Sequence, residues 1–137
     1  MYFSLQKPAR GTALRERRQR KADADAHEKR EKAKVRARDR QCRWPGCSCK
    51  TLRLPLEVSH VVAKSLGGSS DADQMILMCC ERHRGTPSLH SGDLEVRPQT
   101  KRGTDGPCDF MELREDGRWD CVGSERTWRV SVPRGNR

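Results

Sequence analysis

The segment Leu56–His83 reads LEVSHVVAKSLGGSSDADQMILMCCERH, and it decides the fold that we expect for the chain. Its β-prone start, LEVSHVV, predicts a short strand with His60 near the end. A glycine-containing loop, KSLGGSSDAD, follows, and the apolar run MILMCC then leads into His83, which we place on a helix. Two histidines held at the end of a strand and on the following helix suit a general base and a metal ligand that act on one phosphodiester.

Composition limits the size of the core and the class of partner. The 137 residues allow one domain with extensions, and only 33% of them are hydrophobic, so we expect a structural metal to supplement the core. The formal net charge of +10 points to a polyanionic partner, with nucleic acid as the first candidate. A basic surface that serves only solubility would give the same charge, so the motif decides between the two.

Cysteine usage and the N-terminal residues indicate the compartment. The start, MYFSLQKPARG, lacks the apolar core of a signal peptide, and no apolar run approaches the roughly 20 residues of a transmembrane helix. Seven cysteines in a chain without an export signal favour metal ligands and free thiols over disulfides. We therefore expect a cytoplasmic protein with no membrane partner.

The chain divides into three parts by composition. We predict a basic helical arm over residues 1–37, the compact module over residues 38–98 and a β-rich extension over residues 99–137. In the extension CDFMEL, WDCV and TWRVSV are predicted strands, and the stretches GTDGP and EDGRW are predicted turns. We expect the extension to pack on the module.

Residues 10–40 predict a long, charged helix. No proline or glycine interrupts the run from Thr12 to Arg40, and Ala, Glu, Lys and Arg are good helix formers. A wide apolar stripe is missing, so we expect a solvated helix stabilised by pairs such as Glu28 with Lys32, and we expect His27 to be solvated too. Two interpretations remain open: a frayed or disordered tail, and an arm that lies along DNA phosphates and orders on binding.

The cysteines predict a structural zinc site. Two ligands on a turn and two at the start of a helix close a loop in many small zinc sites. The candidates lie on the turn CRWPGC, just after it, and before His83: Cys42, Cys47, Cys49, Cys79 and Cys80. Trp44 in this turn is expected to pack over the zinc. The alternative is that these cysteines are small buried hydrophobes.

Residues 38–110 resemble the HNH endonucleases of phages and bacteria, whose ββα-metal (His-Me finger) site is identified by a His, a central Asn and a final His. His60 and His83 match the two histidines, and Gln74 stands where the family has Asn. The expected fold is therefore α+β: a small ββα-metal core with a zinc knuckle, a charged N-terminal helix and a short β-rich C-terminal extension.

The resemblance assigns roles within the expected catalytic site. His60 would be the general base, and the amide of Gln74 would orient the loop that carries it. The family often places a metal ligand directly before the base, where this chain has Ser59; Glu57 on the same face of the strand is a candidate substitute. His83 would bind a divalent cation such as Mg²⁺ or Mn²⁺. Lys64 and the Gly67-Gly68 pair are expected in the loop over the site.

The resemblance also orders the zinc ligands. Three cysteines match the family's positions: Cys42, Cys47 and Cys79. The fourth position falls on Arg82, which cannot bind zinc but could clamp a phosphate. The fourth ligand stays open between Cys49, Cys80 and His83. If zinc takes His83, then His90 in SLHSGDL becomes the candidate ligand of the catalytic ion.

These features predict a metal-dependent DNA endonuclease that nicks or cuts double-stranded DNA, as a monomer or a homodimer. The expected contacts to DNA are Arg17, Arg18, Arg20, Lys64, Arg82 and Arg84. The rival interpretation is a zinc-stabilised nucleic-acid-binding module that has lost catalysis, and the residues that favour it are Ser59 and Gln74. An RNA-binding protein is a weaker interpretation because no set of stacking aromatics is present.

Overall fold

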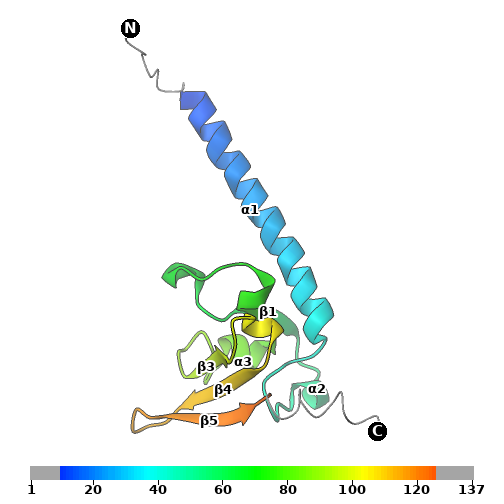
Figure 1. Cartoon of the computed structure of the whole chain (residues 1–137), viewed down its shortest axis with the longest axis vertical. Helices are drawn as coiled ribbons and strands as arrows, with labels where there is room; N and C mark the ends of the chain where they lie inside the picture. Colours follow the sequence, from blue (N-terminus) through cyan, green and yellow to red (C-terminus); the bar gives the residue numbers. More distant parts are fainter. Residues whose placement is uncertain (1–9, 126–137) are drawn as a thin grey trace.

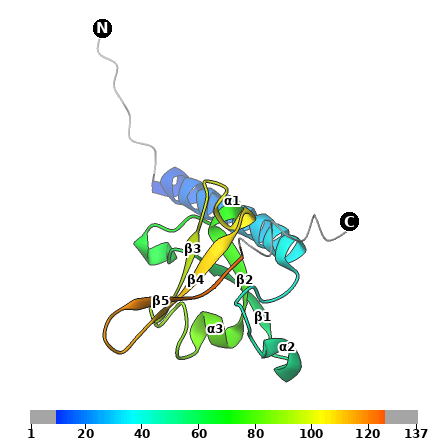
Figure 2. The same cartoon turned by 60° about the horizontal axis from the view of Figure 1, so that its bottom comes forward.

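A computed structural model describes residues 10–125 (Figure 1). Helix α1, Arg10–Asp39, is followed by two small antiparallel sheets and several short helices, which is the mixture of helix and sheet that an α+β fold requires. The N-terminal part of α1 extends away from the sheets, and both sheets lie on the same side of it (Figures 1 and 2). No helix in the described range is both long and apolar enough to cross a membrane.

Helix α1 confirms the helix expected from the charged segment. Glu28 and Lys32 form the expected pair, with 3.3 Å between Oε1 and Nζ. The expectation of a fully solvated helix is wrong for its C-terminal part. Val35 is 0% exposed and packs against Val58 and Leu77. One apolar side chain and several ion pairs hold the helix against the rest of the fold. A docking surface of this kind has no wide apolar stripe, so the sequence pattern does not reveal it.

The first sheet pairs β1, Leu56–His60, with β2, Met75–Cys79, and β2 leads directly into the short helix α3, Cys80–Arg84. All five residues of β2 are buried because the two faces of this strand pack on different layers. Met75 and Leu77 face α1, and the alternating residues face the second sheet. The strand that ends at His60 forms as predicted, and the apolar run expected to lead into His83 forms β2, so that Cys79 ends a strand and directly precedes the helix.

The second sheet has the order β3-β4-β5, with β3 at Leu94–Pro98, β4 at Cys108–Leu113 and β5 at Trp119–Ser124. The predicted strands CDFMEL and WDCV are confirmed as β4 and β5, and TWRVSV lies outside the described residues. The boundary expected between residues 98 and 99 falls between β3 and β4, which pair with each other. The sheet is therefore shared by the expected module and its extension.

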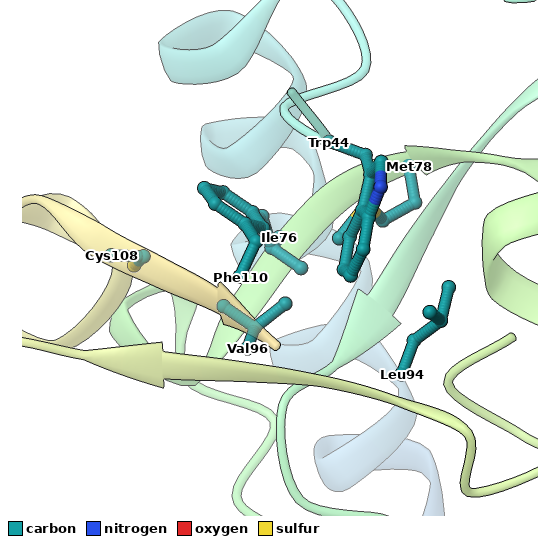
Figure 3. Packing of buried hydrophobic residues seen from close by; sticks show 7 residues of the cluster. All are labelled: Trp44, Ile76, Met78, Leu94, Val96, Cys108 and Phe110. Atoms are coloured by element: carbon teal, nitrogen blue, oxygen red, sulfur yellow. The ribbon is translucent and has the colours of Figure 1, made fainter. Parts of the chain in front are cut away.

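The main core lies between β2 and the second sheet. The side chains that converge there are Trp44, Ile76, Met78, Leu94, Val96, Cys108 and Phe110 (Figure 3). Trp44 is 5% exposed and meets Phe110 edge to face, with 5.4 Å between ring centroids. Because Trp44 belongs to the turn CRWPGC, this contact anchors the cysteine turn in the core.

A buried ion-pair network joins α1 to both sheets. Asp39 at the end of α1 accepts a hydrogen bond from the backbone N–H of Leu77, and its carboxylate contacts Arg38 and Arg43. Arg38 donates to the carbonyl oxygens of Ala72 and Met75. Arg43 donates to backbone carbonyls between β3 and β4 and to the carboxylate of Glu125. The network satisfies backbone groups that apolar side chains could not satisfy.

The Asp39→Asn variant tests the network. Because both arginines would lose a buried anionic partner, we expect the free energy of unfolding to fall by about 3 kcal/mol or more. Chemical denaturation followed by circular dichroism measures this decrease. Asp25→Asn, an exposed position on the same helix, is the matched control. Equal stability of the two variants would show that the network contributes little.

Candidate functional site

Four cysteines form a compact cluster beside the core. The ligand sulfurs of Cys42, Cys47, Cys49 and Cys79 all lie within 4.8 Å of one another, and those of Cys47 and Cys79 are 3.6 Å apart. Tetrahedral zinc with Zn–S bonds of about 2.3 Å separates its sulfurs by about 3.8 Å. The cluster can therefore hold a metal ion such as zinc, with the three expected ligands and with Cys49 as the fourth.

Three segments of the fold bring these sulfurs together. Cys42 and Cys47 lie on the turn after α1, Cys49 begins the short helix α2 (Cys49–Leu52), and Cys79 ends β2. The turn is tied to β2 by a hydrogen bond from the backbone N–H of Arg43 to the carbonyl of Leu77. Cys42 and Cys47 also pack against the apolar cluster that contains Trp44, in keeping with the expected packing role of that indole.

The electrostatics of the cluster differ from one thiol to the next. Burial raises the pKa of Cys42 and raises that of Cys49 to about 11. Burial also opposes ionisation of Cys47, but hydrogen bonds from Cys49, Arg82 and Cys79 outweigh it and lower the pKa of Cys47 to about 7. Of these three thiols, Cys47 is therefore the one that most readily becomes the thiolate a metal requires.

Arg82 assists the cluster from outside. Its guanidinium carbon lies 5.7 Å from the centroid of the Trp44 ring, and its side chain hydrogen-bonds the thiol of Cys47. A cation in this position offsets the negative charge of a cluster of thiolates. Arg82, which stands where the HNH resemblance expects a fourth zinc ligand, therefore lies beside the cysteine cluster. Its predicted contact with a DNA phosphate stays a prediction.

His83 lies in a second group, on the opposite side of β1 from α1. Its Nδ1 lies 3.1 Å from Oε1 of Glu57, and its ring centroid lies 4.4 Å from that of His90. Burial lowers the pKa of His83 although the Glu57 carboxylate raises it. Lowering of this pKa favours the neutral imidazole, which is the form that can bind a metal.

Glu57 is shared between His83 and Arg84. Arg84 donates from Nε and Nη2 to the two carboxylate oxygens at 2.9 and 2.7 Å. Within the described residues, Glu57, His83 and His90 are not among the groups whose three ligand atoms all lie within 4.8 Å of one another. The donor set suits a divalent cation, and a bound cation would compete with Arg84 for the carboxylate.

Ser59 shares the face of β1 that carries Glu57, as expected from strand alternation. It is 1% exposed, and its Oγ has no hydrogen-bond partner among the described residues. A buried hydroxyl without a partner is uncommon because it loses its hydrogen bonds to water on folding. Its position directly before His60 is the one from which the HNH resemblance expects a metal ligand.

His60 lies in a third group, on the face of β1 that looks toward α1. Its Nε2 is 3.2 Å from Oγ of Ser70 and 3.5 Å from Oε1 of Glu28 on α1. Lys64, in the short helix η1 (Lys64–Leu66), donates to the other oxygen of Glu28 at 3.0 Å. The predicted base and the predicted metal ligand are therefore in separate hydrogen-bonded groups, although the charge of His83 is near enough to lower the pKa of His60.

Gln74, at the end of the short helix η2 (Ala72–Gln74), contacts the chain near His60 through its backbone. The N–H of Val61 donates to the carbonyl of Gln74 at 2.9 Å. The side-chain amide points elsewhere: a Cβ added at Gly103 would lie 3.1 Å from its Nε2. Gly103 itself has φ +61° and lies so close to the carbonyl of Asp73 that only glycine fits.

The loop between β1 and β2 is fastened to α1 at several points. His27 is hydrogen-bonded through Nε2 to the Asp71 carboxylate at 2.8 Å, and Glu31 accepts from the backbone N–H of Ala72 at 3.4 Å. The ligand atoms of His27, Glu31 and Asp71 also lie within 4.8 Å of one another. His27 lies on the helix with its side chain 46% exposed, as expected of a solvated residue, and in addition it contacts this loop. Its spacing of four residues from Glu31 is the one local signal of a shared face.

The cationic residues expected to contact DNA lie in two regions. Arg17, Arg18 and Arg20 are exposed on the part of α1 that extends beyond the sheets (Figure 1). Lys64 and Arg84 are more than half exposed, and each is already paired with a carboxylate. Comparison with family models, with curated proteins and with solved structures gave no match to this chain.

Metal content tests the cysteine cluster. We expect the purified chain to hold a single zinc ion at this cluster and the Cys79→Ser variant to lose it, because a hydroxyl is a poor replacement for a thiolate ligand. Inductively coupled plasma mass spectrometry measures the metal, and thermal unfolding with and without a strong chelator measures its effect on stability. Cys121→Ser, at an exposed cysteine outside the cluster, should keep the metal. Full zinc content in Cys79→Ser would contradict the site.

Proposed function

We propose that this chain is a metal-dependent endonuclease of the HNH type that hydrolyses phosphodiester bonds of double-stranded DNA. The observation that carries the proposal is the order β1-β2-α3, in which His60 ends the first strand and His83 lies on the helix after the second. This is the sequence of elements that a ββα-metal site uses to present its base and its ligand. The cysteine cluster would be the structural zinc site of that fold.

His60 is the proposed general base. Burial lowers its pKa, and the nearby Glu28 carboxylate only partly opposes this effect. The imidazole is therefore neutral near pH 7 and can take a proton from the attacking water. A base of this kind contributes about 10²- to 10⁴-fold to the rate of hydrolysis.

Glu57 and His83 are the proposed ligands of one divalent cation such as Mg²⁺ or Mn²⁺, with His90 beside them. When bound, the cation would stabilise the negative charge that develops on the phosphate. Arg84 holds Glu57 in this structure and, being largely exposed, is the nearest candidate to contact the phosphate in addition. Glu57 and His83 fit such an ion by the chemistry of their donors, one carboxylate and one imidazole, and water would complete its coordination.

The basic face of α1 supports DNA as the substrate. The net charge is +10, and Arg17, Arg18 and Arg20 lie on an exposed helix without apolar cover. Contacts of this type bind phosphates without regard to base sequence. A single site of this type nicks one strand, and cleavage of both strands would use two copies of the chain.

A second candidate function is a zinc-stabilised nucleic-acid-binding module without catalysis. The observations that favour it are the partnerless hydroxyl of Ser59 and the separation of His60 and His83 into different hydrogen-bonded groups. The alternative keeps the zinc cluster and the basic helix. It differs from the nuclease only in the absence of cleavage.

Nicking of supercoiled plasmid tests the nuclease. We expect relaxation in Mg²⁺ or Mn²⁺ that stops with EDTA, and a decrease of about 10²-fold or more in His60→Ala, because the base is removed. His83→Ala should show a smaller decrease that grows at low metal concentration, since it removes a ligand and not the base. Cleavage by His60→Ala at the wild-type rate would refute the assignment. Salt-sensitive DNA binding without cleavage in any ion would favour the second candidate, the binding module without catalysis.

The salt dependence of DNA binding tests the helix as an interface. Replacing Arg17, Arg18 and Arg20 with Gln should weaken binding, and the slope of log K against log salt should fall by about 0.9 for each phosphate that the helix no longer neutralises. Fluorescence anisotropy with a short duplex at several salt concentrations measures both. The matched control removes three exposed charges near the second sheet, at Lys101, Arg102 and Arg118. Equal slopes in the two triple variants would exclude α1 as the interface.

A further inference from the structure

Glu28 lies beside the proposed general base, His60, but has no part in the proposed chemistry. It lies on α1, its side chain is 16% exposed, and Oε1 is 3.5 Å from Nε2 of His60, whose own side chain is 14% exposed. Lys32 and Lys64 hold the carboxylate at 3.3 and 3.0 Å, so its orientation is restrained from two sides. A restrained carboxylate next to one nitrogen of an imidazole affects how that ring carries its proton.

The contacts of His60 distinguish its two ring nitrogens. Nε2 faces the carboxylate of Glu28 and the hydroxyl of Ser70. An ionised carboxylate only accepts hydrogen bonds, whereas a serine hydroxyl donates or accepts as required. The pair is therefore best satisfied when Nε2 carries the hydrogen. The lone pair of the neutral ring then lies on Nδ1, which is the nitrogen left to accept a proton.

We propose that Glu28 is a positioning residue for His60: its carboxylate holds the imidazole in the Nε2–H form and aims Nδ1 away from α1 as the proton acceptor. This inference rests on the proposed function for its role in catalysis, but the contact itself can be tested without cleavage. Helix α1 is then part of the catalytic site as well as a surface for DNA. The charged groups that face His60 are Glu28 and Lys32 on α1 and Lys64 on η1, and His83 acts on it only electrostatically from the other side of β1.

The arrangement parallels the way in which a carboxylate orients a catalytic histidine in hydrolases. There the acid fixes the tautomer and the direction of the ring, and the histidine moves the proton. In this chain the carboxylate comes from a helix far earlier in the sequence, and the lysines on either side keep it ionised, since hydrogen bonding to Lys64 lowers the pKa of Glu28 more than burial raises it. No atom of Glu28 needs to touch the substrate.

Nitrogen-15 NMR of the imidazoles tests the contact directly. At about pH 8 the ring of His60 is neutral, since burial lowers its pKa, and long-range proton–nitrogen correlations distinguish the two tautomers. We expect His60 in the full-length zinc-bound chain to be in the Nε2–H form, and Glu28→Ala to shift it to a mixture. The signal is assigned by its absence in His60→Ala. An Nδ1–H form in the wild type, or an unchanged tautomer in Glu28→Ala, would overturn the proposal.

Cleavage rates test the catalytic consequence. We expect kcat to fall about 10-fold in Glu28→Ala with little change in KM, and Glu28→Gln to recover most of the rate because its amide oxygen keeps an acceptor beside Nε2. Glu31→Ala, which removes the contact of α1 with the backbone N–H of Ala72 in the same loop but leaves Glu28 beside His60, controls for a merely structural effect. Glu16→Ala, at an exposed glutamate of α1, controls for the change in net charge. Wild-type kcat in Glu28→Ala would overturn the positioning role.

The tautomer measurement and the cleavage rates test the role of Glu28 and the nuclease function separately. If the wild-type chain does not nick DNA in any ion, the proposed nuclease fails, and the tautomer measurement alone decides whether Glu28 orients His60. If the chain nicks DNA and the tautomer is insensitive to Glu28, the nuclease stands and the positioning role fails.

Discussion

The buried carboxylate of Asp39 is the group on which the arrangement of α1 and both sheets depends. It lies where the helix ends, binds the backbone of β2 and contacts two arginines, and these arginines reach the loop before β2 and the turns of the second sheet. A chain with so few apolar residues cannot hold a helix of 30 residues by hydrophobic contact alone. Instead, charged groups whose hydrogen bonds are satisfied hold the helix, and they also fix its rotation about its axis.

The cysteine cluster and the apolar core reinforce each other through Trp44. Its indole packs against Phe110 in the core, while the turn that contains it carries Cys42 and Cys47. A metal held by four thiolates would close the chain from the end of α1 to the end of β2. Arg82 adds a cation next to this cluster and lies over the same indole, so one aromatic ring connects the cysteine cluster, the core and the helix that carries His83.

Local patterns predicted much of this fold, because short strands and clustered cysteines leave local traces. The strand that ends at His60 and the apolar run MILMC are visible in residue type and spacing, and the HNH resemblance selects three of the four cysteines that cluster. The contacts between α1 and the loop after β1 do not: His27 reaches Asp71 and Glu28 reaches His60 across more than thirty positions of the chain. Polar contacts at such separation have no periodicity, and the single buried Val35 is too small a signal to predict the docked helix.

The straight course of α1 has a geometric consequence for any nucleic acid that it binds. The helix rises about 1.5 Å per residue, so the charged groups near Arg17 lie about 16 Å along its axis from Glu28 and the histidine beside it. That length corresponds to about five base pairs of a duplex. Because α1 is fastened to the loop that follows His60, it would set a fixed distance along the duplex. Under the proposed function, the stretch of DNA covered by α1 would lie to one side of the phosphate that is cleaved near His60.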